Sequence, residues 1–209
     1  MTTATRAPTK APEAPGSPKI PRLERGKARV VALKLAGAQV FAERGYDAAT
    51  MTEIATRASA SIGSLYQFFP TKELLARAIH DELLDAMTVM LEELGKEVGS
   101  RTGSKLIDLL FARLSEFLEQ HPAFSTLAQR GEVDPERKLA TRVGMRQQIG
   151  LLLSRTTTPL TPERSESVAI LILELMKMVV GLGKTDGPKV RNAVLDELRT
   201  MLFRHLEIG

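Results

Sequence analysis

The sequence predicts an all-α fold with two helical domains. Apolar residues recur at helical spacing through most of the 209 residues, and no stretch has the alternation of a strand. Start and stop signals divide the chain into about nine helices. Charge separates the two ends, because residues 1–80 contain 12 Lys and Arg against 6 Asp and Glu, and residues 81–209 contain 17 against 19. A basic domain that binds a polyanion, joined to a different domain, explains this better than chance scatter.

Composition narrows the function classes. Hydrophobic residues make up 43% and charged residues 26% of the chain, as in ordinary soluble globular proteins. The absence of cysteine excludes a disulfide framework and a thiolate metal site. The most apolar run, Val168–Leu182, contains Glu174 and Lys177 and is too short to span a membrane. We therefore expect a cytoplasmic protein without membrane, metal or cofactor.

The first segment, residues 1–21, holds five of the eleven prolines and almost no large apolar side chains. It cannot bury enough surface to offset the entropy of ordering, so we predict a disordered N-terminal arm. Its basic residues would allow contact with a DNA minor groove, and a plain tail is the alternative.

A three-helix domain follows over residues 22–70. The first helix is predicted over Arg22–Arg44, with basic residues in its early turns, and Gly45 ends it. Tyr46, just beyond, should pack against Phe41. A compact helical core with a basic end is suited to contact a phosphate backbone.

The segment Thr50–Phe69 has the pattern of a helix-turn-helix. Thr50 and Glu53 form a capping box at the start of a short helix over Met51–Ala58. Small residues interrupt this helix, and the last of them, Ser61, can cap a second helix over Ile62–Phe69. The second helix carries small and hydrogen-bonding side chains where a surface helix ordinarily carries Lys and Glu.

Residues 71–209 form the second predicted domain. Its first helix is long and begins with Thr71 as the cap, so it connects the two domains directly. Apolar periods and breaks predict helices at about 71–95, 104–120, 123–130, 134–155, Pro162–Gly183 and Lys189–Leu206.

Residues 30–75 resemble the DNA-binding domain of TetR-type transcriptional regulators, the TetR/AcrR-like helix-turn-helix family. The resemblance depends on VFAERGY at 40–46, SIGSLYQFF at 61–69 and TKELL at 71–75. The rest of the chain agrees with the family in length and helix count only.

Two positions depart from the family pattern. The family turn has glycine where this chain has Ser59, so the turn should be strained or differently angled. Gly37 replaces the usual alanine and should cost the first helix up to about 1 kcal/mol.

The resemblance implies a DNA-contacting surface. Gln67 can read adenine through two hydrogen bonds, and Tyr66 and Lys72 would contact phosphates. Ile62 could touch a thymine methyl or turn inward, Tyr66 could be plain core, and Lys72 could be a solvated surface lysine. The predicted DNA-binding residues are Thr50, Thr52, Ser61, Ile62, Gly63, Ser64, Tyr66, Gln67 and Lys72.

The resemblance also implies a cavity for a small-molecule effector of unknown identity. Methionine and phenylalanine suit an adaptable apolar pocket, and an ordinary core is the alternative for each of them. The predicted ligand-binding residues are Met87, Met90, Phe111, Phe117, Phe124, Leu127, Met145, Gln148 and Met176.

The implied function is a homodimeric, nucleoid-associated repressor that a small apolar ligand releases from a palindromic double-stranded DNA operator. The dimer would form through Pro162–Gly183 and Lys189–Leu206, and burial of these helices within one chain is the alternative. A TetR-like activator, a ligand-independent DNA binder and a helical adaptor protein stay open. We do not expect an enzyme, since the three histidines lack ligand spacing and no nucleophile elbow or phosphate loop occurs.

Overall fold

A computed structural model describes residues 22–98, 102–128, 135–185 and 187–207 of the chain. This described part contains nine helices and no strand, as the sequence predicts. The predicted N-terminal arm lies outside it. The helices are α1 (Arg22–Ala48), α2 (Met51–Arg57), α3 (Ile62–Phe68), α4 (Lys72–Val98), α5 (Gly103–Gln120), α6 (Ala123–Ala128), α7 (Pro135–Ser154), α8 (Pro162–Thr185) and α9 (Gly187–Glu207).

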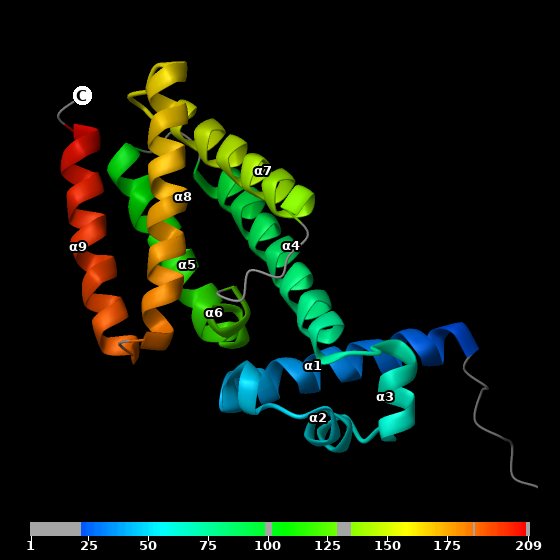
Figure 1. The fold of residues 1–209 in the computed structure, drawn as a ribbon. Helices are drawn as coiled ribbons and strands as arrows, with labels where there is room; N and C mark the ends of the chain where they lie inside the picture. The colour runs from blue at the N-terminus through cyan, green and yellow to red at the C-terminus, as the bar shows by residue number, and fades with distance from the viewer. Residues whose placement is uncertain (1–21, 99–101, 129–134, 186, 208–209) are drawn as a thin grey trace, which may run out of the picture.

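The first three helices form one end of the molecule. In Figure 1, α2 and α3 lie below α1, and α4 rises from this group into the remaining helices. Their shared core buries Leu33, Phe41, Ile54 and Leu65 completely. The Tyr46 ring stacks on Phe41 with its centroid 5.5 Å away, which confirms the predicted contact.

Helix α4 belongs to both cores, so the predicted direct connection between the domains is confirmed. Leu75 and Ile79 lie in the first core, whereas Met87 and Leu91 lie in the C-terminal core. One continuous helix, Lys72–Val98, therefore contributes side chains to both cores.

The close approach of α1 to α4 explains Gly37. A Cβ at this position would lie 2.9 Å from Ile79 Cδ1 and 3.2 Å from Leu75 Cδ2. The absent side chain therefore allows two helices to meet at short distance, which offsets the loss of helix propensity that the sequence predicts.

The short helix α6 is a second connection, which the sequence analysis did not predict. Ala123 and Leu127 are buried in the first core against α1, whereas Phe124 is buried in the C-terminal core. Two helices, α4 and α6, therefore join the domains.

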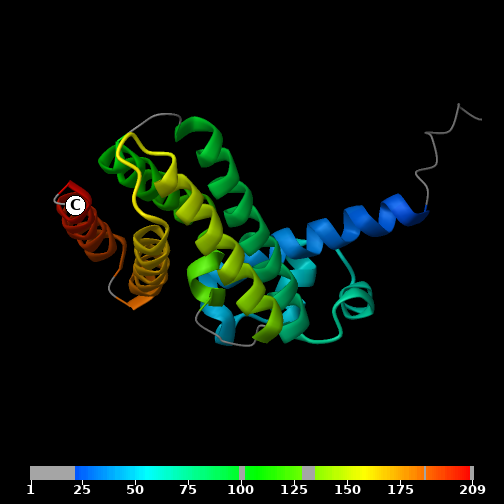
Figure 2. The same cartoon turned by 90° about the horizontal axis from the view of Figure 1, so that it is seen from above.

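The last two helices lie side by side and run in opposite directions at the far edge of the molecule (Figure 1). Seen from above, α7 lies between α8 and α4 (Figure 2). Five large apolar side chains of α8 and α9 are exposed: Ile170, Leu171, Met178, Val190 and Met201.

Helix boundaries differ from the predictions mainly at glycines. Gly45 has φ 75° and ψ 168°, so the predicted stop is real, although a further short helical stretch extends α1 to Ala48. The predicted turn at residues 183–188 is too long, because α8 continues to Thr185 and α9 begins at Gly187. Among the described helices, none is long and apolar enough to cross a membrane.

Candidate nucleic-acid interface and ligand cavity

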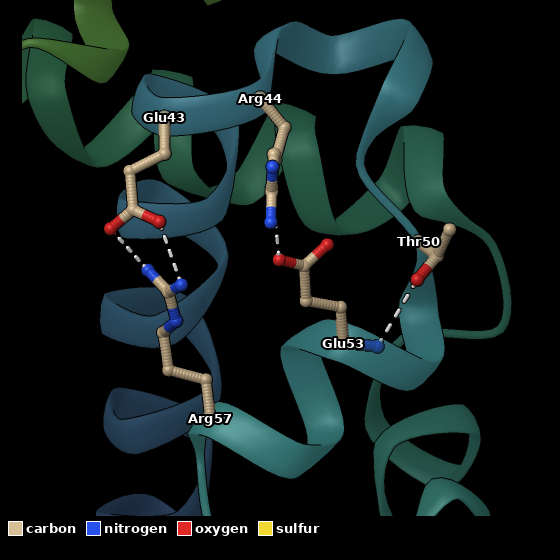
Figure 3. Close-up of polar contacts among 5 residues, drawn as sticks. All are labelled: Glu43, Arg44, Thr50, Glu53 and Arg57. Carbon is tan, nitrogen blue, oxygen red and sulfur yellow. Dashed lines mark hydrogen bonds and ion pairs between the residues drawn. The ribbon is translucent and has the colours of Figure 1, made fainter.

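Two hydroxyl caps begin the helices of the helix-turn-helix, as predicted. The exposed Thr50 accepts from the backbone N–H of Glu53 at 3.1 Å, and Ser61 accepts from that of Ser64 at 3.1 Å. The second half of the predicted capping box is wrong. The Glu53 carboxylate accepts instead from Arg44 Nε at 3.3 Å (Figure 3).

Ion pairs fix α2 against the end of α1. Figure 3 shows Arg57 of α2 turned towards Glu43 of α1, and its Nη2 donates to Glu43 Oε2 at 2.7 Å. This hydrogen bond from Arg57 lowers the pKa of Glu43. Arg44 and Glu53 form a parallel link between the same helices. Both pairs are partly exposed, so they add modestly to the buried core that holds α2 against α1.

The turn between α2 and α3 has the strain that the sequence predicts. Ser59 has φ 49°, a left-handed conformation that costs a residue with a Cβ about 1–2 kcal/mol. Arg29 of α1 donates to the Ser59 carbonyl at 3.2 Å. Arg29, one of the basic residues in the early turns of α1, therefore stabilises this turn.

The exposed face of α3 carries both apolar and polar side chains. Ile62 is 40% and Tyr66 48% exposed, so neither the inward orientation of Ile62 nor a core role for Tyr66 holds. Gln67 is exposed between Tyr66 and the exposed Phe68, and Ser64 is half-buried. Leu65 and Phe69, at 0% and 8% exposure, hold the helix to the core, as expected.

Gly63 lies on this same exposed face. Apart from its chain neighbours and the backbone of its own helix, no atom of the described residues lies within 4 Å of the position that its Cβ would occupy. Packing within the chain therefore does not require glycine at this position. Close approach of an external surface such as a DNA backbone would require it.

Lys72 is not the solvated surface lysine of our alternative interpretation. Its Nζ donates to the carbonyl oxygens of Tyr46 at 2.9 Å, Asp47 at 3.2 Å and Ala49 at 2.9 Å. An ammonium has three N–H donors, so Lys72 closes the end of α1 with all of them. The predicted phosphate contact stays a prediction. Thr52, on α2, is exposed.

A second bond reinforces this junction. The Tyr46 hydroxyl donates to Glu73 Oε1 at 2.9 Å. The pKa of Glu73 is lowered by its own backbone N–H first and by the Tyr46 hydroxyl second. The start of α4 is thus tied to the end of α1 by a cation and by a carboxylate.

The C-terminal core surrounds a cavity of about 430 Å³, within the usual range of small-ligand pockets. Helices α4 to α8 contribute its walls. The lining residues are His80, Leu84, Met87, Leu114, Phe124, Ala128, Thr141, Arg142, Met145, Leu173, Glu174, Met176, Lys177, Val180 and Gly181.

Four predicted ligand-binding residues, Met87, Phe124, Met145 and Met176, line this cavity. The other five do not, and lie elsewhere. Met90, Phe111 and Phe117 pack in the C-terminal core, and Leu127 lies in the first core. Gln148 donates to Glu92 Oε1 at 3.1 Å.

The polar lining residues were missed by the sequence analysis. His80 is 7% exposed and stacks on Phe124 with centroids 5.7 Å apart. Glu174 and Lys177 had a visible signal, because they interrupt an otherwise apolar run. Their placement in a cavity wall depends on how α8 is rotated, which helical spacing alone does not define.

The fold and this surface define a class of protein, a two-domain helical regulator with a helix-turn-helix. Two family profiles match. "Bacterial regulatory proteins, tetR family" covers residues 35–79, and "Tetracyclin repressor-like, C-terminal domain" covers residues 104–206. The chain belongs to the TetR family of bacterial transcriptional regulators.

Two relatives share just over a quarter of their aligned residues with this chain. The chain is 27% identical over 112 residues to the HTH-type transcriptional repressor KstR of Rhodococcus jostii, covering 53% of this chain and 49% of that protein. It therefore spans about half the length of this relative. It is 28% identical over 157 residues to the uncharacterized HTH-type transcriptional regulator Rv0681 of Mycobacterium tuberculosis, covering 71% and 70%.

Solved structures share the fold. The crystal structure of AibR in complex with isovaleryl coenzyme A and operator DNA aligns with a TM-score of 0.61 and 17% identity. The alignment covers 84% of this chain and 98% of AibR.

Proposed function

We propose that the protein is a homodimeric repressor that binds a palindromic operator through α3 and is released by a small ligand in the C-terminal cavity. The exposed face of α3 carries this proposal. Ile62, Tyr66 and Phe68 would be an unusual surface for a helix in water, yet they suit a helix that contacts base edges and phosphates.

Two similar proteins support repression and release by a ligand as parts of the proposal. KstR is named a transcriptional repressor, and AibR was crystallised with both an acyl coenzyme A and operator DNA. In this chain α4 and α6 each contribute to the cavity wall and to the first core. A ligand with different affinities for two positions of these helices would change the orientation of α3.

The exposed apolar residues of α8 and α9 support dimerisation. A second copy packed on this face would cover Leu171 and Met178, which are both 44% exposed, whereas Ile170 lines the groove between α7 and α8. A twofold dimer would place two copies of α3 about one DNA turn, ~34–36 Å, apart. A palindromic operator follows from that symmetry.

A gel-shift experiment on the DNA upstream of the protein's own coding sequence tests DNA binding. We expect binding that is sequence-specific and weakens steeply with salt. Tyr66→Ala should weaken it while the dimer persists, and Gln67→Ala should reduce sequence preference more than affinity. Lys72→Ala should weaken it as well while the dimer persists, both by opening the α1–α4 junction and by removing the proposed phosphate contact. A protein that binds none of this DNA, or all DNA equally, would fit the adaptor alternative better.

Sedimentation of a surface variant tests the dimer. Leu171→Asp should convert the protein to monomers, because a carboxylate would be buried in the proposed interface. Leu151→Asp is the matched control, since Leu151 is also an exposed leucine, at 55% against 44% for Leu171, but belongs to α7. Equal sedimentation of both variants would contradict an interface at α8.

A further inference from the structure

The C-terminal cavity has two chemically different ends. Side-chain exposure orders its lining from a floor to a rim. Leu114, Phe124 and Met176 are at most 4% exposed, whereas Arg142, Glu174 and Lys177 have side chains that are 42%, 44% and 67% exposed. A bound molecule would therefore have its apolar part among the first group and its other end among the second.

The rim charges form a connected group with an excess of positive charge. Glu174 of α8 makes an ion pair with Arg142 of α7, and its other oxygen lies 3.8 Å from Lys177 Nζ. Among the lining residues that the structure describes there are two basic side chains, Arg142 and Lys177, and one carboxylate, Glu174. One carboxylate cannot neutralise both cations, so a second anion at this rim would gain a favourable interaction.

The Arg142–Glu174 ion pair borders both the cavity and a groove on the surface. Arg142 and Glu174 line the cavity, and they line a surface groove of about 390 Å³ between α7 and α8 as well. The polar end of a molecule in the cavity would thus emerge beside the pair. An anionic end there would be attracted by Arg142 and repelled by the Glu174 carboxylate, so it would compete with Glu174 for the Arg142 Nη2 donor that this pair uses.

We infer that the ligand of this cavity is an amphipathic anion: an apolar chain or ring buried against the floor, with a carboxylate or other anionic group that replaces Glu174 at Arg142 and Lys177. This inference rests on the proposed ligand control, and it narrows the class from any small apolar molecule. Neutral hydrophobes would fill the same floor but leave the rim charges as they are.

Calorimetric titration of the full chain without DNA tests this class of ligand. The probes share a hydrocarbon chain and differ in the end group: decanoate, decanol and decyltrimethylammonium, with octanoate and dodecanoate to vary length. We expect the best carboxylate to bind about tenfold more tightly than decanol, and the ammonium compound to bind most weakly. Decanol binding as tightly as every carboxylate, or no binding by any probe, would overturn the inference.

Substitutions at the ion pair give a sharper test, because the two partners should act in opposite directions. Arg142→Gln and Lys177→Gln should weaken decanoate binding, by about tenfold for Arg142, and leave decanol unchanged. Glu174→Gln removes the competing carboxylate and should strengthen decanoate binding by about threefold. If the pair were merely structural, Arg142→Gln and Glu174→Gln would weaken binding together, and that result would overturn the inference.

Two controls keep the result readable. Arg113→Gln breaks a similar ion pair, with Glu97 at 2.8 Å, on α5 outside the cavity lining, and should leave decanoate binding unchanged. Lys177 is largely exposed, so the Lys177→Gln variant should fold even if Arg142→Gln does not.

Decanoyl coenzyme A distinguishes a free acid from a thioester whose charges lie further from the hydrocarbon chain. Because DNA is absent, failure here leaves the repressor proposal intact, and failure to bind DNA leaves this inference intact.

Discussion

The two cores of this protein leave different amounts of space between their side chains. Between α1 and α4, a single added Cβ at Gly37 would come within 2.9 Å of Ile79 Cδ1. In the C-terminal core, the side chains surround a cavity of about 430 Å³. The first arrangement fixes the orientation of the α3 surface, which recognition needs. The second can admit a ligand, so rigidity and adaptability are divided between the domains.

Truncating one buried side chain in each core should give the largest difference in stability between the two domains. Ile54 is 0% exposed in the first core, and Met145 is 4% exposed at the cavity wall. We expect Ile54→Ala to lower the free energy of unfolding by about 4 kcal/mol and Met145→Ala by about 2 kcal/mol, because the second leaves no new void in a filled core. Urea unfolding at fixed protein concentration measures both. Equal losses would mean that the cores do not differ in packing.

Adding a methyl group tests the same difference from the other side. Gly37→Ala should destabilise the protein by about 1 kcal/mol, since overpacking against Leu75 and Ile79 exceeds the gain in helix propensity. Gly144→Ala in α7 is the control. Apart from its chain neighbours and its own helix backbone, no described atom lies within 4 Å of the added Cβ, so this change should stabilise the protein by up to about 1 kcal/mol. A stabilised Gly37→Ala variant would show that α1 and α4 can separate freely.

The strained turn of the helix-turn-helix offers a smaller effect. Ser59→Gly should stabilise the protein by about 0.5 kcal/mol, because glycine adopts φ 49° without steric cost but loses more backbone entropy on folding. Thermal unfolding measures the change, and Ser59→Ala, which keeps the Cβ, should show no gain. If both variants gain equally, the serine side chain and not the backbone is responsible.

The weakest effect concerns the link between α1 and α2. Arg57 lowers the pKa of Glu43 below its ordinary value of 4.5 in the folded protein. The stabilisation is therefore present above pH 4.5 and is lost as the pH falls through the lowered pKa. Arg57→Gln should reduce the loss of melting temperature on acidification below pH 4.5. An unchanged acid profile would mean that other carboxylates dominate it.

Much of the first domain could be predicted from local patterns. Hydroxyl caps at Thr50 and Ser61 act on backbone groups three residues away, so sequence spacing is enough to find them. The buried positions of Leu65 and Phe69 follow from helical periodicity in the same way. The prediction for Glu53 was wrong because a residue outside the local pattern, Arg44 of α1, competes for its carboxylate.

The cavity was less predictable. Side-chain size and flexibility selected Met87, Phe124, Met145 and Met176, which line the cavity, but the same criteria also selected Leu127, which lies in the other core. His80 and Arg142 carry no local signal for a cavity wall. Their selection depends on how several helices are rotated against one another.

The sequence by itself determined the helices of the described residues, the hydroxyl caps at Thr50, Ser61 and Thr71, the helix-turn-helix and the family, because these depend on interactions among residues that are near in the chain. Only the tertiary structure decided that Lys72 closes the end of α1, that α6 joins both cores, and that Arg142 and Glu174 meet at the rim of a cavity. Arg142 and Glu174 are brought together by the packing of α7 against α8. Such contacts arise from the burial of whole helix faces, which no local spacing encodes.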